Sequence, residues 1–494
     1  MKLSRSTESH GSYWLWILVG ILLLAYMLRL IGLTSESLWI DEGYSLALAS
    51  HNARDIVKGT AADQHPPLYY LLLHLWLSVG RSVFHLRYLS VLIGMLGVAT
   101  GALVGQQLLG RRAGIVAALL LACSPMHIWY SQEARMYILL ALLTTLSAYT
   151  SWRLVRGLGG WMLYGLSTLL ALYTHYFAGF ILLFENVLTL AWGLKQRQDR
   201  FLLRWVGTQI ALAAAFAPWL PVAVYQARFH QMRWIRPPTA ETVRNTLILM
   251  TLGNSGVHQD EILPLIGLGL IVLAVVGATW RAHEQGRLGA YMFLLLWFAF
   301  PFSAVVAISQ IYPIFQSKQF LILLLPLLVL VAGALVELPR GLQLVLAGVL
   351  VFFITGSASD LYLSNTKNGW REAAAYIEER YETGDVLYLN PAAGALTLRV
   401  YLHQLPPCEG YPPGYDIVQG GWEGEQVTAV IAESIMVALA AEYRRVWLVE
   451  FNPEFWDPEA HLAAWLERHG QMVADRSFRG VRVRLYELTR GSGP

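Results

Sequence analysis

Twelve apolar segments recur along the chain, and they leave few folds open to it. They run over 13–33, 68–80, 86–108, 113–130, 136–155, 161–175, 176–194, 203–225, 262–280, 289–309, 319–337 and 342–359. Of the 494 residues, 56% are hydrophobic and only 14% are charged. This composition is typical of a polytopic membrane protein rather than of a soluble globule. The sequence therefore predicts a polytopic α-helical membrane protein.

One of these segments is too short to cross a bilayer. As a helix rising 1.5 Å per residue, residues 68–80 would span roughly 20 Å, whereas a bilayer core is about 30 Å thick. The segment follows His65-Pro66-Pro67, and proline favours the first position of a helix. We therefore expect a juxtamembrane helix along the outer interface, and about eleven membrane-spanning segments in all.

The basic residues between the segments predict the orientation of the bundle. Residues 13–33 are longer than a signal-peptide core and lack a clear cleavage site, so we expect a retained anchor. Most basic residues then fall on one side, which the positive-inside rule assigns to the cytoplasm. They are Lys2, Arg5, Arg111, Arg112, Arg153, Arg156, Lys195, Arg197, Arg200, Arg281, Arg287 and Arg340. The sequence predicts a multi-pass protein of the cytoplasmic membrane, with its N-terminus in the cytoplasm.

The segment 226–260 is the exception to this sorting. It falls on the outer side, yet it carries Arg228, Arg233, Arg236 and Arg244. Either these arginines hold an anionic ligand, or a long loop evades a rule that applies to short loops. The sequence leaves both readings open.

Residues 361–494 differ from the rest of the chain in their charge. Of the 33 Asp and Glu residues, 15 precede Leu361 and 18 follow it, although the second part is much shorter. We expect a membrane domain over residues 1–360 and an extracytoplasmic soluble domain over residues 361–494. In the soluble part, helical patterns alternate with short β-like runs, which indicates an α/β fold. The helical patterns are Trp370–Arg380, Thr428–Tyr443 and Glu459–His469, and the strand patterns are Asp385–Leu389, Arg445–Glu450 and Val481–Glu487.

Charge and cysteine content exclude several classes of function. A net charge of +3 is close to neutral and argues against a nucleic-acid partner. Cys123 lies in an apolar segment and Cys408 in the soluble part, so no disulfide between them is expected. The sequence has no zinc-type set of Cys and His residues and no nucleotide motif. No cofactor is predicted, and only a divalent cation is left open.

Two adjacent carboxylates, Asp41 and Glu42, lie just after the first apolar segment. A carboxylate close to lipid is costly unless it faces water, protein or a ligand. A positioned carboxylate can also take the proton from an attacking hydroxyl, as a transferase requires. Asp41 and Glu42 are therefore candidate catalytic residues.

The predicted outer loops collect aromatic, acidic and basic side chains. Aromatic faces stack on sugar rings, carboxylates accept hydroxyl protons, and basic groups neutralise phosphate. The candidate substrate-binding residues are His65, Tyr130, Glu133, Arg135, Tyr137, His175 and Lys318. Taken singly, each has an ordinary explanation, such as an aromatic anchor at the interface or a snorkelling lysine. The joint pattern favours a sugar site.

Glu185, with Asn186 beside it, lies in the middle of an apolar segment. An ionisable residue inside a membrane span is a candidate functional residue by default. A buried structural hydrogen bond explains it equally well. The sequence leaves both readings open.

The order of these motifs resembles a known family. After the first span come D-E-G-Y from Asp41, H-P-P-L-Y-Y-L-L-L from His65, L-R-Y-L-S-V-L-I-G from Leu86, S-P-M-H-I-W-Y-S-Q-E-A-R-M-Y from Ser124 and Y-T-H-Y-F from Tyr173. This set is similar to bacterial members of glycosyltransferase family 39, the protein O-mannosyltransferase-like branch, and to the aminoarabinose transferases that modify lipid A. The resemblance covers about residues 10–200 well and implies the GT-C fold class.

The resemblance also implies a chemistry. It implies a polyprenyl-phosphate-linked sugar as donor, catalysis at the outer face, inversion at the anomeric carbon, and a catalytic Asp at the position of Asp41. Protein mannosyltransferases carry an acid after the second-loop arginine, but Leu140 stands there, so the role of Glu133 is open. A basic residue before a late span, often an Arg-Tyr pair in relatives, corresponds here to Lys318-Gln319.

The sequence thus predicts a mannosyltransferase-like membrane glycosyltransferase that acts on a lipid, an envelope glycan or a protein. Asp41 would act as base, Arg135 or Lys318 would stabilise the departing phosphate, and Glu42 and Glu133 would orient the acceptor. Two alternatives stay open. One is a transporter or flippase of lipid-linked sugars, and Glu185 is the one feature of the sequence that favours it. The other is a ligase or polymerase that moves a whole glycan en bloc.

Overall fold

The structure, a computed structural model, describes residues 6–229, 235–253, 262–363, 367–404, 406–420 and 425–489. Contacts within the chain group it into two compact units. The first comprises Met1–Leu33, His65–Tyr69 and Arg87–Ser364, and the second comprises Thr34–Gln64, Tyr70–Leu86 and Asn365–Pro494. Most of the first predicted outer loop therefore belongs to the same unit as the C-terminal residues.

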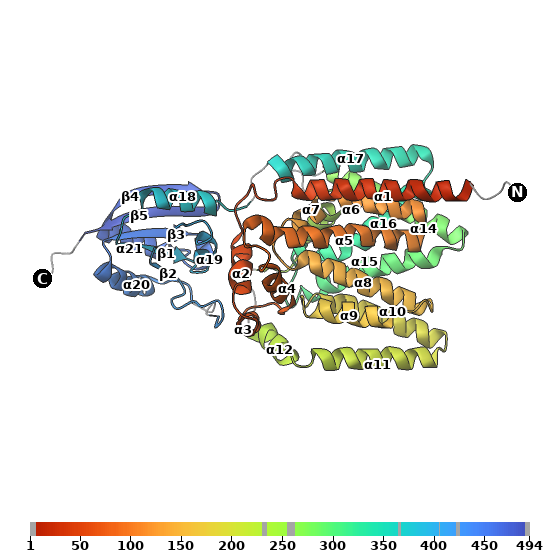
Figure 1. The fold of residues 1–494 in the computed structure, drawn as a ribbon, viewed down its shortest axis with the longest axis horizontal. Helices are drawn as coiled ribbons and strands as arrows, with labels where there is room; N and C mark the ends of the chain where they lie inside the picture. The colour runs from red at the N-terminus through yellow and green to blue at the C-terminus, as the bar shows by residue number, and fades with distance from the viewer. Residues whose placement is uncertain are drawn as a thin grey trace. The chain divides into compact units, whose positions relative to one another are not determined.

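The first unit is a bundle of helices (Figure 1). Among the described residues, eight helices are long and apolar enough to cross a membrane, and ten if each of two bent pairs is one span. These helices and bent pairs correspond to ten of the eleven predicted spans, whereas α9, at the predicted span 161–175, has only 12 residues and is not among them. The predicted helical membrane fold is confirmed. The helices are α1 (Ser6–Leu30), α5 (Val83–Leu109), α6 (Arg111–Cys123), α7 (Pro125–Ser131), α8 (Tyr137–Val155), α9 (Trp161–Leu172), α10 (Ala178–Lys195), α11 (Asp199–Phe216), α12 (Leu220–Phe229), α13 (Ala240–Thr251), α14 (Ile262–Glu284), α15 (Leu288–Ile308), the 3-10 turn η1 (Ser317–Phe320), α16 (Leu321–Glu337) and α17 (Arg340–Leu363).

Helix α16 lies at the centre of this bundle. Its residues Leu321 to Ala334 are all buried, and it packs against α6, α8, α14 and α15. A helix that is apolar all round is expected inside a bundle. Helices α11, α14 and α17 instead expose large apolar side chains, as lipid contact requires. Examples are Leu203, Ile210, Leu273, Val276, Leu344 and Val351.

Two of the predicted spans are broken helices. Helices α6 and α7 meet at an angle of 61°, and helices α11 and α12 meet at 70°. Each break contains a proline, Pro125 and Pro218, whose ring cannot continue the preceding helix. Pro125 instead starts α7, where Ser124 Oγ accepts the backbone N–H of His127 at 3.4 Å. The first break leads directly into the second predicted outer loop.

The segment predicted as a long outer loop, 226–260, is partly helical. Helix α12 reaches Phe229 and α13 follows at Ala240–Thr251. Arg244 on α13 lies 3.7 Å from Glu241, one turn away, which is an ordinary surface ion pair. Arg228 lies in the last turn of α12, and Arg233 lies outside the described residues.

The C-terminal part of the second unit contains a sheet of five strands among the described residues, in the order β2-β1-β3-β5-β4. The strands are β1 (Asp385–Asn390), β2 (Cys408–Gly410), β3 (Arg445–Glu450), β4 (Gly470–Phe478) and β5 (Val481–Leu488). Strand β1 pairs in parallel with β2 and β3, whereas β5 pairs antiparallel with β3 and β4. Every residue of β1 is buried, as expected for a strand covered on both faces.

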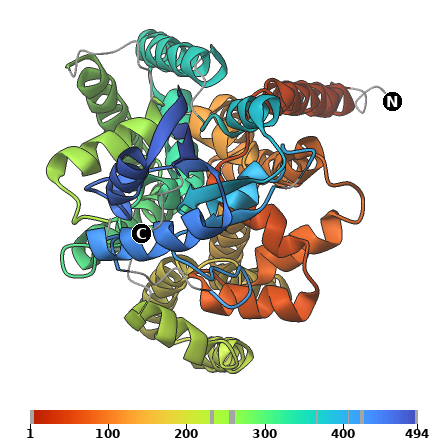
Figure 2. The same ribbon diagram turned by 90° about the vertical axis from the view of Figure 1, so that its left-hand side faces the viewer.

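Helices cover both faces of this sheet, which is drawn in blue in Figure 2. Helices α20 (Ala429–Glu442) and α21 (His461–His469) pack on one face through Met436 and Leu462. Helices α18 (Trp370–Arg380) and α19 (Gly394–Leu398) pack on the other through Trp370 and Leu398. The predicted α/β fold is confirmed. Strands β2 and β4 were not predicted, because β2 is only three residues long and β4 is a largely exposed edge strand with a polar sequence.

The first loop adds helices to this second unit. Helix α2 (Ile40–Ala49) and helix α3 (Ala53–Ala62) follow α1 in the chain. Ile40 packs against the same core as α18 and α19. The next helix, α4 (Leu68–Trp76), has nine residues, so the prediction that residues 68–80 do not span a membrane is confirmed.

Candidate active site

Five of the predicted substrate-binding residues lie together in the first unit. The rings of His65 and His175 are 5.1 Å apart, and the rings of Tyr137 and His175 are 6.1 Å apart, measured between centroids. Lys318 Nζ lies 5.2 Å from the centre of the Tyr137 ring, a cation–π contact. The Arg135 guanidinium is close enough to act on both imidazoles. We call these five residues the cationic cluster.

Loops and helix ends bring the cationic cluster together. The backbone N–H of Leu68 donates to the carbonyl of Tyr173 at 3.0 Å, which brings the start of α4 to the turn after α9. In that turn, the N–H of Phe177 donates to Nδ1 of His175 at 3.1 Å, so the neutral ring carries its proton on Nε2. Lys318 lies on η1, which Ser317 links to Thr246 of α13 through a hydrogen bond of 2.8 Å.

The two histidines of the cluster are neutral. Burial, together with the charges of Lys318 and Arg135, lowers the pKa of His175 to about 3. Burial also lowers the pKa of His65 well below its usual value, with His175, Arg135 and Lys318 adding to the effect. The positive charge of the cluster therefore resides on Arg135 and Lys318, while the imidazoles supply neutral hydrogen-bonding groups. Such a set of groups suits an anionic ligand.

The remaining two predicted binding residues lie beside this cluster. The ring of Tyr130 is 5.6 Å from the ring of Tyr137, in an edge-to-face arrangement. Glu133 is buried, and its backbone carbonyl accepts the N–H of Arg135 at 2.8 Å. The short turn between α7 and α8 thus presents Glu133, Arg135 and Tyr137 from one tight piece of backbone.

Arg29, which was not predicted as a site residue, contacts the residues that lead into this turn. It is fully buried at the end of α1, and its guanidinium donates to the carbonyls of Leu121 and Ala122 at 3.1 and 3.2 Å. It also bonds Nδ1 of His127 at 2.8 Å and Oγ of Ser131 at 3.2 Å. These groups flank the break between α6 and α7. The available signal was an arginine inside an apolar segment.

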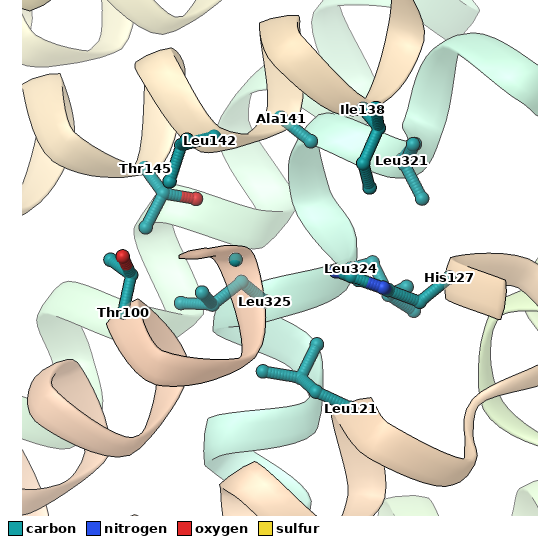
Figure 3. Close-up of a pocket in the computed structure, with 11 residues that line it drawn as sticks. Thr100, Leu121, His127, Ile138, Ala141, Leu142, Thr145, Leu321, Leu324 and Leu325 are labelled. Atoms are coloured by element: carbon teal, nitrogen blue, oxygen red, sulfur yellow. The ribbon is translucent and has the colours of Figure 1, made fainter. Parts of the chain in front are cut away.

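A small apolar hollow lies between helices α5 to α8 and α16 (Figure 3). Its walls are mostly aliphatic, with the hydroxyls of Thr100 and Thr145 and the ring of His127 as polar exceptions. The other lining residues are Gly97, Leu121, Ile138, Ala141, Leu142, Leu321, Leu324 and Leu325. The hollow is apolar and offers no charge to a sugar phosphate.

Glu185 lies apart from these features, in a closed network of hydrogen bonds within the bundle. Its two carboxyl oxygens accept from Ser147 Oγ at 2.6 Å and from the Tyr164 hydroxyl at 3.2 Å. Gln209 donates to the same tyrosine at 3.1 Å. The adjacent Asn186 accepts from Trp205 Nε1 at 2.9 Å. This geometry favours the structural reading of Glu185, because its carboxyl group links α8, α9 and α10.

The predicted catalytic pair lies in the first turn of α2, in the second unit. Asp41 is half-buried, whereas the side chain of Glu42 has no exposed surface. Glu42 Oε2 lies 3.2 Å from Nζ of Lys367 and accepts the backbone N–H of Trp39 at 3.1 Å. Adjacent helical residues project about 100° apart, so the two carboxylates face different surroundings. Only Asp41 has surface that a substrate can reach.

Metal ligation finds no support among the described residues. Within those ranges, no three side chains of His, Cys, Asp or Glu converge as ligands would.

Comparisons with known proteins agree with this architecture. The family model described as dolichyl-phosphate-mannose-protein mannosyltransferase matches residues 64–225. The crystal structure of ArnT from Cupriavidus metallidurans in the apo state superposes with a TM-score of 0.63 at 15% identity, over 96% of this chain and 98% of that one. The chain shares the GT-C fold of this structure.

Two further structures share the GT-C fold with this chain. ArnT from Cupriavidus metallidurans bound to undecaprenyl phosphate gives a TM-score of 0.58 at 16% identity, over 98% and 99% of the two chains. The oligosaccharyltransferase AglB from Archaeoglobus fulgidus, in complex with an inhibitory peptide and a dolichol-phosphate, gives 0.54 at 13% identity, over 98% of this chain and 75% of that one. A comparison with curated proteins gives no match.

Proposed function

We propose that the protein is a membrane glycosyltransferase that moves one sugar from a polyprenyl-phosphate carrier to a hydroxyl of a lipid, an envelope glycan or a protein. The reaction takes place at the outer face of the cytoplasmic membrane and inverts the anomeric carbon. The observation that carries the proposal is the cationic cluster, where Arg135 and Lys318 lie with two neutral imidazoles. A phosphate monoester is an anion of the kind that an arginine and a lysine bind.

In this mechanism Asp41 is the base. Its carboxylate takes the proton of the acceptor hydroxyl while the hydroxyl oxygen forms a bond to the anomeric carbon. The bond between that carbon and the phosphate oxygen breaks in the same step, and its electron pair leaves with polyprenyl phosphate. Arg135 and Lys318 stabilise the charge that develops on the leaving phosphate. A single displacement of this kind inverts the configuration.

The donor's lipid tail suits the apolar hollow. An isoprenoid chain is apolar along its length, and the hollow is lined mainly by aliphatic side chains. The ArnT and AglB structures contain undecaprenyl phosphate and dolichol-phosphate, respectively. Both are polyprenyl monophosphates, which supports this class of carrier for the present chain.

The test is transfer of radiolabelled sugar from polyprenyl monophosphate donors by the purified full chain in membranes. We expect Asp41→Asn to lower kcat by roughly 10²–10⁴-fold, since the base is lost. The matched control is Asp55→Asn in the next helix, whose carboxylate lies beside the exposed Lys58 and accepts from the side chain of Asn52. Activity that survives in Asp41→Asn would overturn the assignment of the base.

A second arm tests the phosphate site. Lys318→Gln should lower kcat by roughly 10²–10³-fold, because a fixed cation is lost from the leaving group. Lys195→Gln, which removes an exposed lysine at the end of α10, should leave kcat unchanged. Sugar that moves across sealed vesicles without being transferred would instead identify a flippase. Mass spectrometry of lipids and envelope glycans, with and without the gene, would identify the sugar and the acceptor.

A further inference from the structure

Glu42 does not have the surroundings of a second catalytic acid. Its carboxylate is enclosed within the second unit, with 0% of the side chain exposed, and its partner Lys367 is 6% exposed. A general base must reach the proton that it removes. Glu42 instead contacts a lysine that lies just before the C-terminal α/β fold and the backbone of its own helix start.

Both contacts of Glu42 fix the first turn of α2. The carboxylate reaches back to the N–H of Trp39, the residue before the helix, as the glutamate of a capping box does. The same oxygen receives Lys367 Nζ at 3.2 Å. A buried ion pair holds its geometry tightly, since either charge left alone in the interior is strongly unfavourable. Asp41 stands between Trp39 and Glu42 in the chain, so these contacts restrain the backbone that carries it.

The residues before α2 are held by the same part of the chain. The Arg371 guanidinium donates to the carbonyls of Thr34 and Ser35 at 3.0 and 3.1 Å. The hydroxyl of Tyr401 accepts the N–H of Leu38 at 2.7 Å. These bonds attach the loop's backbone to the C-terminal residues at several points, independently of Glu42.

Close packing holds the opposite side of the turn. A Cβ atom on Gly43 would lie 2.1 Å from Oγ1 of Thr397 on α19, and 2.9 Å from its Cα. Helix α2 therefore approaches α19 more closely than any side chain at position 43 would allow. The turn that carries Asp41 is thus enclosed by Glu42–Lys367, Gly43–Thr397 and Leu38–Tyr401.

We propose that the C-terminal α/β domain, with Lys367 at its start, positions the catalytic loop, and that Glu42 is the residue through which the Lys367 ammonium orients Asp41. Glu42 is a positioning residue, and its ion pair with Lys367 sets the direction in which the Asp41 carboxylate points. The inference rests on the proposed function, in which Asp41 is the base. It gives the soluble domain a role in the transfer reaction even where no acceptor touches it.

The experiment compares Glu42→Gln, Lys367→Met and the double variant in the full-length protein. Each single variant removes one partner of the buried ion pair, so kcat should fall roughly tenfold to a hundredfold while the KM for the donor changes little. The double variant removes both charges, and we expect it to recover to within about fivefold of the parent. No second substitution at Lys367 could restore a lost proton acceptor.

Hydrogen exchange provides a readout that does not depend on activity. In the single variants, the amides of residues 39–49 should exchange faster, and the double variant should slow them again. The matched control is the exposed pair Asp55 and Lys58, whose charged atoms are 3.9 Å apart with side chains 31% and 56% exposed. Asp55→Asn with Lys58→Met should change neither kcat nor exchange in residues 39–49.

The inference is overturned if Glu42→Gln and the double variant are equally inactive while exchange in residues 39–49 is unchanged. Glu42 would then act in the chemistry itself. Asp41→Asn, measured alone, separates this failure from failure of the proposed function. If Asp41→Asn stays active, the base assignment is wrong, whereas the exchange data still report whether Glu42 and Lys367 hold α2.

Discussion

Asp41 and Glu42 are neighbours in sequence, yet burial gives them different surroundings. The sequence predicted both as candidate catalytic residues, because it shows two acids beside a membrane span but not what covers them. The partner of Glu42 is Lys367, 325 positions further along the chain. No local pattern connects two residues so far apart. Candidate catalytic residues could be predicted from the sequence, but the different roles of neighbouring candidates depend on tertiary contacts.

Gly43 provides a test at the residue scale. Replacing a helical glycine by alanine usually stabilises a helix by about 0.5–1 kcal/mol. Gly43→Ala should do the reverse and cost about 1–3 kcal/mol, because the new methyl group would overlap Thr397. Thermal unfolding in detergent measures the change, and kcat should fall with it. Gly348→Ala on α17, where no atom lies within 4 Å of the added Cβ, is the control. Equal effects of the two substitutions would contradict this packing.

The buried histidines predict how stability depends on pH. The pKa of His175 falls from 6.5 to about 3 on folding, so only the unfolded chain binds this proton between those pH values. Stability should therefore be full above about pH 6.5 and should decline as the pH falls towards 3. His175→Gln should flatten this decline, because it removes one of the groups responsible. Melting temperatures of both proteins at pH 7.5, 5.5 and 4.5 provide the comparison. Parallel curves would mean that His175 does not contribute.

At the scale of helices, the spans could be predicted but their breaks could not. Continuous apolar runs mark residues 113–130 and 203–225 as single spans, whereas each bends at a proline. The proline is visible in the sequence, but the bend needs partners for the carbonyl groups that the break leaves without a helical bond. Arg29 provides such partners at the first break. Its position within an apolar run was the one signal for it in the sequence.

Arg29 therefore predicts an effect on α6 and α7. Arg29→Met removes the donors to the carbonyls of Leu121 and Ala122, and an unsatisfied buried acceptor costs about 1–3 kcal/mol. We expect a lower melting temperature and a higher KM for the donor, since the turn with Arg135 follows α7. Arg112→Met at the exposed start of α6 should change neither quantity. A destabilised protein with an unchanged KM would show that the break does not position that turn.

Helix α8 allows a test of the apolar hollow. Ala141 lines it, and Ala141→Phe would fill much of the space with an aromatic ring. If the donor's tail lies there, KM should rise several-fold for a long-chain polyprenyl donor and change less for a short-chain analogue. Ala191→Phe on the exposed side of α10 is the control. An equal rise in KM for both donors would exclude the hollow as the binding site of the donor's lipid tail.

At the scale of the whole chain, the distribution of charged residues predicted more of the fold than the sequence motifs did. The higher density of acidic residues after Leu361 predicted a separate C-terminal domain, and that part of the chain has an α/β fold. The sequence did not reveal that residues 34–64 share a compact unit with that part, because their apolar contacts, such as Ile40, are too few to form a pattern. The predicted boundary at residue 360 therefore describes the composition better than the packing.

The charge sorting also leads to a prediction about orientation. Within the first unit, the turn between α14 and α15 and the end of α16 meet where Arg287 lies 2.8 Å from Glu337. This is the end where the positive-inside rule places the cytoplasm. A cysteine introduced at Lys195, the last residue of α10, should therefore be protected from a membrane-impermeant maleimide in intact cells. A cysteine at Glu442, exposed at the end of α20, should be labelled. Both are made in a background of Cys123→Ser and Cys408→Ser, and permeabilised cells, where both sites should react, are the control. The reverse labelling pattern would place the C-terminal domain and Asp41 in the cytoplasm and would refute transfer at the outer face.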